Sequence, residues 1–436
     1  MRGFLDKQKY QQQTDSPTAT RPGIRFACQF AVNNNYDFGH IDLKTAFLQG
    51  EEYDWSRDVV CQLPPEAGLP PHIGARLKKP AYGMNDAPRR WWNRIDASLR
   101  QYGMIPARAD RCLYVLYDDD TISEAKHSSR SNPLKRQTSD SKPLVRDYSE
   151  QIEDFMNTML DPVTVSPSKG RKAIGIMVLH VDDLFITGSK KFWEHVVGKL
   201  RKDYQIGSED KGDVVFTGQR IRKQGIPIIL DQDKGIEELS EIKLDKNLAD
   251  TMTCPPALHT EYRSVLGALN WLQSRTQYGA AYKFSRAASA AAAPTIADVK
   301  ALNKVVRTVR AQPQRLYFWP LKGPLRLIGY PDASFKNNED HSSQRGQCIF
   351  LAEQRKTFPS SSRSSGQRQK NSSIRSCGEN KLENPNAKGS LIDYESTKIK
   401  RTTLSTTVAE LYSFMKCYGT CLYLKGLWQD LSLIHI

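Results

Sequence analysis

Two short apolar runs separated by a polar break stand out in the middle of the chain. The first covers residues 173–179, and the second covers residues 184–187 and ends at Gly188. Both have the length of a strand and are rich in β-branched residues, so they predict two strands joined by a tight turn. Asp182 and Asp183 lie in that turn, between two segments that we expect to be buried.

A second strand-like segment ends near Asp42. Residues 44–46 then predict a turn into a short helix that carries Phe47 and Leu48. Asp42 therefore has two interpretations: it caps the helix that follows, or it supplies a carboxylate to a site.

Three further apolar segments predict strands. Residues 214–221 and 226–230 would form a strand pair, and residues 325–330 would form a strand that ends at Asp332. The composition changes near residues 321–323, so we expect a new structural unit to begin there.

Five segments repeat apolar residues every three or four positions, as amphipathic helices do. They cover residues 88–102, 192–204, 262–272, 296–309 and 404–418. In the first, Trp91 and Trp92 are expected to be core residues more often than stacking platforms. Thr295 is the expected N-cap of the fourth helix, and residues 287–293 are expected to be small-residue filler or a linker.

The last of these segments contains a sequence pattern that is typical of a helix N-terminus. Thr407 and Glu410 fit a capping box. Its expected buried face consists of Leu404, Val408, Leu411, Phe414 and Tyr418.

Two polar stretches interrupt the periodic segments. Residues 118–170 open with Asp118-Asp119-Asp120 and continue as a run rich in serine, lysine and arginine, and residues 357–389 have a similar character. Both are expected to be disordered insertions that bury no core, and for that reason the triple aspartate is not interpreted as a metal site.

The composition points to a polyanionic partner. The chain has 436 residues and a formal net charge of +15, and the excess is spread along the sequence. A distributed positive charge suits contacts with a phosphate backbone.

No apolar run approaches the roughly 18 residues of a membrane span. The eight scattered cysteines indicate reduced thiols in an intracellular protein, and Cys417 with Cys421 lacks the second ligand pair of a zinc site.

The adjacent aspartates of the 173–188 segment leave two interpretations. Two like charges between buried strands raise each other's pKa unless a cation neutralises them, which favours a metal site. Asp-rich turns that cap backbone amides are common as well. A third carboxylate brought to the same place, as Asp42 would be, favours the metal site.

Several motifs together resemble one known family. Residues 42–50 (Asp-Leu-Lys-Thr-Ala-Phe-Leu-Gln-Gly), residues 82–91 and Val181-Asp182-Asp183 resemble the reverse transcriptase of Ty1/copia-type LTR retrotransposons. Residues 262–269 are similar to the segment that follows that domain. Gly329–Ser334 and Leu404–Tyr412 resemble the copia RNase H region.

The resemblance implies an α+β chain with a right-hand polymerase palm and fingers, followed by a truncated RNase H-like α/β domain. The expected domains are reverse transcriptase fingers and palm at 1–250, a helical thumb or connection segment at 251–320, and a partial RNase H-like domain at 321–436. The chain starts at what looks like an internal segment of the family, and residues 431–436 resemble translated adapter sequence. We therefore expect both ends to be incomplete.

The resemblance also implies the site residues. Asp42 and Asp182 would bridge two Mg²⁺ or Mn²⁺ ions, and Asp183 would assist beside them, because nucleotidyl transfer uses two cations about 3.5–4 Å apart. The incoming nucleotide would be lined by Leu43, Lys44, Thr45, Ala46, Phe47 and Arg89. A second metal site, for RNase H chemistry, would use Asp332 and Glu410, although Glu410 could serve only as a cap.

The sequence departs from the family pattern at two places. His180 stands where the family has tyrosine before Val-Asp-Asp, and Met84-Asn85-Asp86 replaces the usual Leu-Lys-Gln. The expected partners are an RNA template, a DNA primer, an RNA–DNA hybrid and dNTPs. The family implies a cytoplasmic particle or the nucleus, and the oligomeric state stays open. Two alternatives remain: a catalytically inactive nucleic-acid-binding relic and, more distantly, a zinc-organised interaction module.

Overall fold

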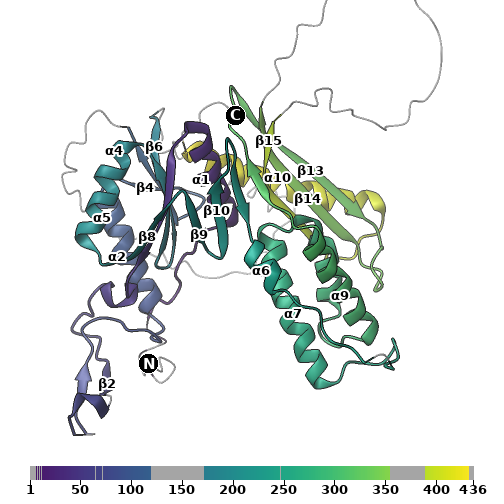
Figure 1. The fold of residues 1–436 in the computed structure, drawn as a ribbon, viewed down its shortest axis with the longest axis horizontal. Helices are drawn as coiled ribbons and strands as arrows, with labels where there is room; N and C mark the ends of the chain where they lie inside the picture. The colour runs from purple at the N-terminus through teal and green to yellow at the C-terminus, as the bar shows by residue number, and fades with distance from the viewer. Residues whose placement is uncertain are drawn as a thin grey trace, which may run out of the picture.

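The fold is taken from a computed structural model (Figure 1). It describes residues 6, 8, 10, 12–63, 65–70, 72–118, 171–245, 247–353 and 388–431. The expectations for Asp119 and Asp120, for nearly all of both polar insertions and for residues 432–436 lie outside the described residues.

A six-stranded antiparallel sheet forms the centre of the N-terminal half. Its strands, in spatial order, are β4 (Ile105–Pro106), β5 (Leu113–Tyr117), β6 (Ala173–His180), β7 (Asp183–Gly188), β1 (Asp37–Leu43) and β8 (Ile206–Lys211). The predicted strand–turn–strand at 173–188 is confirmed as β6 and β7. Both strands are buried on both faces, because alternate residues enter two different core clusters.

Helices cover both faces of this sheet. α1 (Arg21–Asn34) shares a core cluster with one face. The other face packs against α2 (Ala87–Gln101) and the helical run formed by α4 (Lys190–Phe192), the π-helical turn η5 (Trp193–Val197) and α5 (Gly198–Asp203). Trp91 and Trp92 are buried in that second cluster, as predicted.

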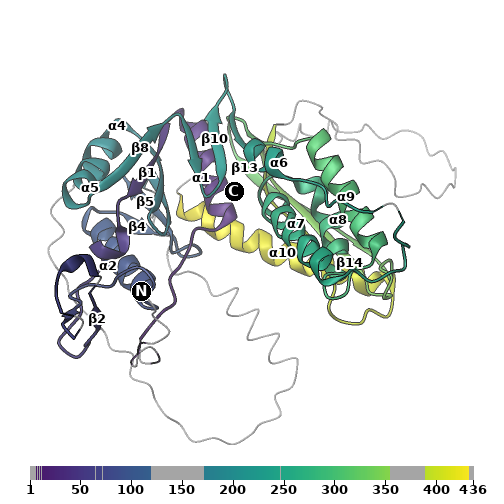
Figure 2. The ribbon, with the colours of Figure 1, turned by 60° about the horizontal axis from the view of Figure 1, so that its bottom comes forward.

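A small arm projects from this half of the molecule (Figures 1 and 2). It carries the two-stranded sheet of β2 (Val60–Gln62) and β3 (Gly74–Arg76), with the 3₁₀ turn η4 (Pro65–Ala67) between them. Another 3₁₀ turn, η3 (Ala46–Gln49), follows β1, which confirms the predicted short helix after Asp42.

A four-stranded sheet connects the N-terminal half to the rest of the chain. Its order is β12 (Leu316–Phe318), β11 (Ile228–Asp231), β10 (Gln219–Lys223) and β9 (Asp213–Phe216). The sequence predicted one strand over 214–221, which is wrong, because Thr217 and Gly218 both adopt positive φ and turn the chain back. The fourth strand, β12, was not predicted.

A helical part follows, with its own core. It comprises α6 (Asp233–Glu238), α7 (Pro256–Arg275), the 3₁₀ turn η6 (Tyr278–Ala280), α8 (Ala281–Ser289) and α9 (Ile296–Ala311). The predicted cap of α9 is confirmed, because Thr295 and Asp298 form a capping box. The alanine-rich tract at 287–293 is not only a linker, since it begins as the last turn of α8.

The C-terminal part is a three-stranded antiparallel sheet with one long helix packed on it. The strands are β13 (Leu325–Ser334), β14 (Gln344–Glu353) and β15 (Gly389–Lys398), and the helix is α10 (Thr406–Asp430). The N-cap of α10 is Ser405, whose hydroxyl accepts from the Val408 amide at 3.2 Å. The predicted capping box of Thr407 and Glu410 is therefore wrong, and Glu410 lies in the second turn.

The expected buried face of α10 is also wrong. Leu411, Phe414 and Tyr418 are 57%, 54% and 47% exposed. The helix instead contacts the sheet through smaller side chains, among them Cys417. A side chain at Gly329 would place its Cβ 2.6 Å from the Cys417 sulfur, so the glycine allows the helix to lie close to β13.

The end of α10 returns to the N-terminal half (Figures 1 and 2). The Trp428 ring lies 5.1 Å from the Phe26 ring of α1, and the buried Asp430 carboxylate accepts from the Arg108 side chain at 2.8 Å. One core cluster therefore joins α1, the four-stranded sheet, the three-stranded sheet and α10. In the described part of the chain, no helix has both the length and the apolar character needed to cross a bilayer.

Candidate active site

The aspartates predicted to act together meet at one end of the six-stranded sheet. Asp42 on β1 and Asp183 on β7 are direct partners in the antiparallel ladder, so their side chains project from the same face. Asp182 precedes Asp183 in the β6–β7 turn. The fold thus brings together three carboxylates from two segments that are far apart in the sequence.

The β6–β7 turn is held by contacts from outside the hairpin. Val181 has φ 58°, a left-handed conformation that is unfavourable for a β-branched residue. The Trp91 indole N–H donates to the Val181 carbonyl at 2.6 Å, and the Leu43 amide donates to the Asp182 carbonyl at 3.0 Å. The strained turn is therefore fixed against both α2 and β1, which restricts where the Asp182 carboxylate can lie.

Burial and the neighbouring carboxylates both disfavour the charged form of Asp182. Burial raises the pKa of the Asp182 carboxyl, and the nearby Asp183 and Asp42 charges raise it further, against the lowering effect of its own backbone hydrogen bond. Bound cations would relieve this repulsion. Asp183 has a specific partner, because its Oδ1 lies 3.0 Å from His40 Nε2. The Asp183 carboxylate is therefore oriented by a side chain of β1 and not by the turn itself.

Two neighbours shape the space around the carboxylates. Gly207 on β8 lies against Asp42, and a Cβ at that position would collide with Asp42 Oδ2. His180 precedes the turn, and its pKa is lowered by burial and by the positive charge of Arg275, while Asp183 and Asp182 oppose this shift. A cation from the end of α7 is thus close enough to influence the hairpin.

The segment predicted to line the nucleotide follows Asp42 directly. Leu43 and Ala46 are buried, whereas Lys44 and Thr45 are exposed. Thr45 has φ 50°, which turns the chain sharply after β1. The Phe47 ring lies 4.8 Å from the Tyr82 ring.

Tyr82 connects that segment to the carboxylates. Its pKa is raised by burial first and then by the negative charges of Asp182 and Asp42. The pair of Phe47 and Tyr82 therefore borders the carboxylate site on the side where the chain leaves β1.

Arg89 is placed on α2 with its guanidinium over the Trp92 ring, 4.9 Å from the centroid. The same group donates to the Asp15 carboxylate at 3.2 Å. In this arrangement Arg89 contacts these two residues and not Asp42 or Asp182, and a nucleotide contact would require it to leave Asp15, whose side chain is 80% exposed.

The donor set suits a hard divalent cation. Among the described residues, no three His, Cys, Asp or Glu side chains are placed to hold a metal ion by themselves, and this includes the surroundings of Cys417 and Cys421. Mg²⁺ usually takes only one or two carboxylates and completes its octahedron with water and substrate phosphates. Asp42 and Asp182 fit that requirement, since both supply carboxylate oxygens and since the fold brings them to the same end of the sheet.

The second predicted pair lies in the C-terminal part. Asp332 on β13 and Glu410 on α10 are both exposed. Ser413, one helical turn after Glu410, donates to the main-chain carbonyls of Asp332 at 2.7 Å and Gly346 at 3.0 Å. The helix turn that carries Glu410 is therefore anchored beside Asp332, but no hydrogen bond joins the two carboxylates in the described structure.

Three neighbours of the site were missed by the sequence interpretation. His40 could have been found, because it lies two residues before Asp42 on the same strand and so faces the same side. Gly207 and the Trp91 indole have no comparable signal, since their roles depend on how β8 and α2 pack.

The chain is similar in sequence to several known proteins. The model of a reverse transcriptase (RNA-dependent DNA polymerase) family matches residues 2–123, a stretch that includes Asp42. The chain is 24% and 23% identical over 357 residues to the retrovirus-related Pol polyproteins from transposons RE2 and RE1 of Arabidopsis thaliana, which covers 78% of this chain and 20% of each relative. It is 26% identical over 134 residues to the Pol polyprotein from transposon TNT 1-94 of Nicotiana tabacum, covering 28% of this chain and 10% of that relative. The chain therefore spans about a fifth of the length of the first two relatives.

Proposed function

We propose that this chain, whose sequence resembles the reverse transcriptase region of copia-type retrotransposon Pol polyproteins, catalyses RNA-directed DNA synthesis. The observation that supports this most strongly is the convergence of Asp42, Asp182 and Asp183 at one end of the central sheet.

Asp42 and Asp182 would hold two Mg²⁺ or Mn²⁺ ions, with Asp183 beside them. When bound, the two ions activate the primer 3′-hydroxyl and neutralise the charge of the leaving pyrophosphate. The protein's part is to fix the two carboxylates through Trp91 and Leu43, which hold the turn. In the absence of the ions, the Asp182 carboxyl binds its proton more tightly than a free aspartate, so metal binding at this site competes with protonation.

The nucleotide would lie along Leu43, Lys44, Thr45, Ala46 and Phe47. Lys44 and Thr45 are exposed next to Asp42, and the Phe47–Tyr82 pair supplies an aromatic wall. Arg89 would contact phosphate after leaving Asp15. An RNA template, a DNA primer and their hybrid would bind through the positive charge spread over the chain, in a cytoplasmic particle or in the nucleus.

The division into 1–250, 251–320 and 321–436 belongs to the same proposal. Ile236, Leu239 and Ile242 pack in the core of the helical part, so its structural boundary lies closer to β11 than residue 250. The 321–436 part would be RNase H-like and would degrade the RNA strand with Asp332 and Glu410, a role supported by the anchoring of Ser413 at the Asp332 carbonyl.

Two assays distinguish an active polymerase from a catalytically inactive nucleic-acid-binding relic. Wild-type protein should extend a DNA primer on an RNA template with Mg²⁺, and Asp182→Asn should not. Asp37→Asn is the matched control, because Asp37 is an exposed aspartate on the same strand as Asp42, at the opposite end of β1. An inactive relic would bind the hybrid with a steep salt dependence but would extend nothing, even in wild-type form.

A further inference from the structure

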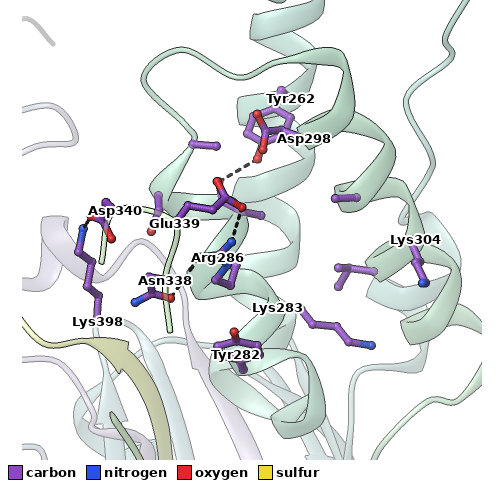
Figure 3. A pocket seen from close by; sticks show the side chains of 15 residues that line it. Tyr262, Tyr282, Lys283, Arg286, Asp298, Lys304, Asn338, Glu339, Asp340 and Lys398 are labelled. Atoms are coloured by element: carbon purple, nitrogen blue, oxygen red, sulfur yellow. Dashed lines mark hydrogen bonds and ion pairs between the residues drawn. The ribbon is translucent and has the colours of Figure 1, made fainter. Parts of the chain in front are cut away.

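A cavity lies between the helical part and the C-terminal sheet (Figure 3). Its volume is about 750 Å³, which is within the range of small-molecule sites. The walls come from α7, α8, α9 and the connection between β13 and β14. None of the residues assigned to polymerase or RNase H chemistry lines it.

Small side chains create the hollow. Ala287 of α8, Ala290 just after that helix and Ala301 of α9 all line the cavity, where larger side chains would take up part of the space. Tyr262 of α7 also lines the cavity, and its hydroxyl donates to the Ala287 carbonyl at 2.8 Å. The alanine-rich tract thus provides an apolar floor.

The acidic groups of the cavity already have partners. Glu339 pairs with Arg286, and Asp340 pairs with Lys398. The Asp298 carboxylate accepts from the Thr295 amide at 2.8 Å and hydroxyl at 2.7 Å in the capping box of α9.

Two lysines of the cavity have no such partner. Lys283 on α8 and Lys304 on α9 are exposed, and within the described residues neither ammonium group makes a side-chain hydrogen bond or ion pair. Figure 3 shows both on the side of the cavity opposite Asp340 and Lys398. An anion at this end would therefore gain two positive charges without displacing an existing ion pair.

An exposed aromatic ring also lines the cavity. Tyr282 precedes Lys283 on α8, lines the cavity and is 42% exposed. A smaller cavity of about 200 Å³ adjoins the first, shares Lys283 and Val305 with it, and continues along α8 and α9 toward Gln312. The site is therefore open to a ligand longer than one unit.

We propose that this cavity binds a nucleotide unit, with the phosphate between Lys283 and Lys304 and the base against Tyr282 and the alanine floor. Basic groups combined with an exposed aromatic ring are the general means of holding single-stranded nucleic acid. The unit is either a free nucleotide or one residue of a single strand. An acidic peptide would use the lysines but would gain nothing from the tyrosine ring.

The test uses the whole chain in EDTA, so that binding which depends on metal at Asp42 and Asp182 is absent. Fluorescence anisotropy measures binding of labelled tetradeoxyadenylate at 0.15 M salt. Lys283→Ala/Lys304→Ala should weaken binding at least tenfold and lower the slope of log K against log salt by about 0.7, the value for one neutralised phosphate of a single strand. Lys283→Arg/Lys304→Arg should retain binding.

Matched variants locate the effect. Lys234→Ala/Lys243→Ala removes two exposed lysines from the same helical part and should leave the affinity within about twofold of wild type. Tyr282→Ala should weaken binding about tenfold, and Tyr282→Phe should not. Photocrosslinking with 8-azidoadenosine 5′-monophosphate should label α8 in wild type and not in Lys283→Ala/Lys304→Ala.

Competition identifies the source of the ligand and can overturn the proposal. Displacement of the strand by adenosine 5′-monophosphate indicates a free-nucleotide site, and displacement only by oligonucleotides indicates a single-strand site. Unchanged affinity in Lys283→Ala/Lys304→Ala overturns the proposal, as does equal competition by hexaglutamate. Asp182→Asn should keep the binding, so failure here is distinct from failure of the polymerase assignment.

Discussion

Replacing Arg25 should lower the free energy of unfolding, because this residue joins three parts of the molecule. Arg25 lies on α1 and is 1% exposed. Its guanidinium donates to the Ile392 carbonyl of β15 at 2.7 Å and to the Arg275 carbonyl at the end of α7 at 2.9 Å. It also lies 3.8 Å from the Asp393 carboxylate and over the Tyr394 ring. One buried side chain therefore links the central sheet's helix, the helical part and the C-terminal sheet.

The size of the effect follows from burial. Burial lowers the pKa of Arg25 and raises the pKa of Asp393, so both groups are held away from water, while each charge opposes the other's shift. Arg25→Met would leave the Asp393 carboxylate buried without its cation. Breaking a buried pair in this way costs about 3–5 kcal/mol of unfolding free energy. Arg25→Met/Asp393→Asn should recover part of that loss, because the uncompensated charge is gone.

Urea unfolding followed by tryptophan fluorescence and by far-UV circular dichroism measures this loss, provided that the two transitions coincide. Arg220→Met is the control, since Arg220 and its partner Asp213 are 49% and 50% exposed. Surface ion pairs of this kind contribute about 0–1 kcal/mol. Equal losses for Arg25→Met and Arg220→Met would show that burial adds nothing to the contribution of Arg25, and a double variant less stable than Arg25→Met would show that the unpaired Asp393 charge is not the cause of the loss.

Two further predictions concern the aspartate site. Asp182→Asn should stabilise the protein in EDTA at pH 8, because the folded-state pKa of Asp182 is raised and its ionised carboxylate therefore lowers the free energy of unfolding. This cost develops as the pH rises above about 3.9, the unfolded value, and is complete above the folded-state pKa, so the advantage of the variant should vanish below about pH 3.9. Melting curves at several pH values test this. Gly207→Ala should reduce primer extension at least tenfold, because the added Cβ would displace the Asp42 carboxylate. Gly198→Ala is the control, because a Cβ at that position would have no atom within 4 Å. It should leave primer extension unchanged and the free energy of unfolding equal or up to about 1 kcal/mol higher. Extension by Gly207→Ala at the wild-type rate would show that Asp42 does not depend on this glycine.

The elements governed by local patterns could be predicted from the sequence. The β6–β7 hairpin has two uniformly apolar runs, and α9 has both a regular apolar face and a capping box, so each is specified by its own residues. The proximity of Asp42 to Asp182 was an expectation drawn from motif order, and the ladder between β1 and β7 accounts for it physically.

Features that depend on packing between distant segments could not be predicted. The turn at Thr217–Gly218 divides a segment that looks like one strand, because apolar residues stand at both of its ends. Strand β12 joins β11 only after the helical part has intervened. In α10 the strongest apolar stripe is exposed, because close approach to Gly329 selects a face of small side chains. The role of Arg25 likewise depends on β15, more than 360 positions away.

The most direct test of the polymerase assignment is incorporation of a single dNTP opposite an RNA template, with Mg²⁺ varied. We expect incorporation by the wild type and by Asp37→Asn, and none above background by Asp182→Asn at any Mg²⁺ concentration. Incorporation by Asp182→Asn at the wild-type rate would contradict the assignment of Asp182 as a metal-holding carboxylate.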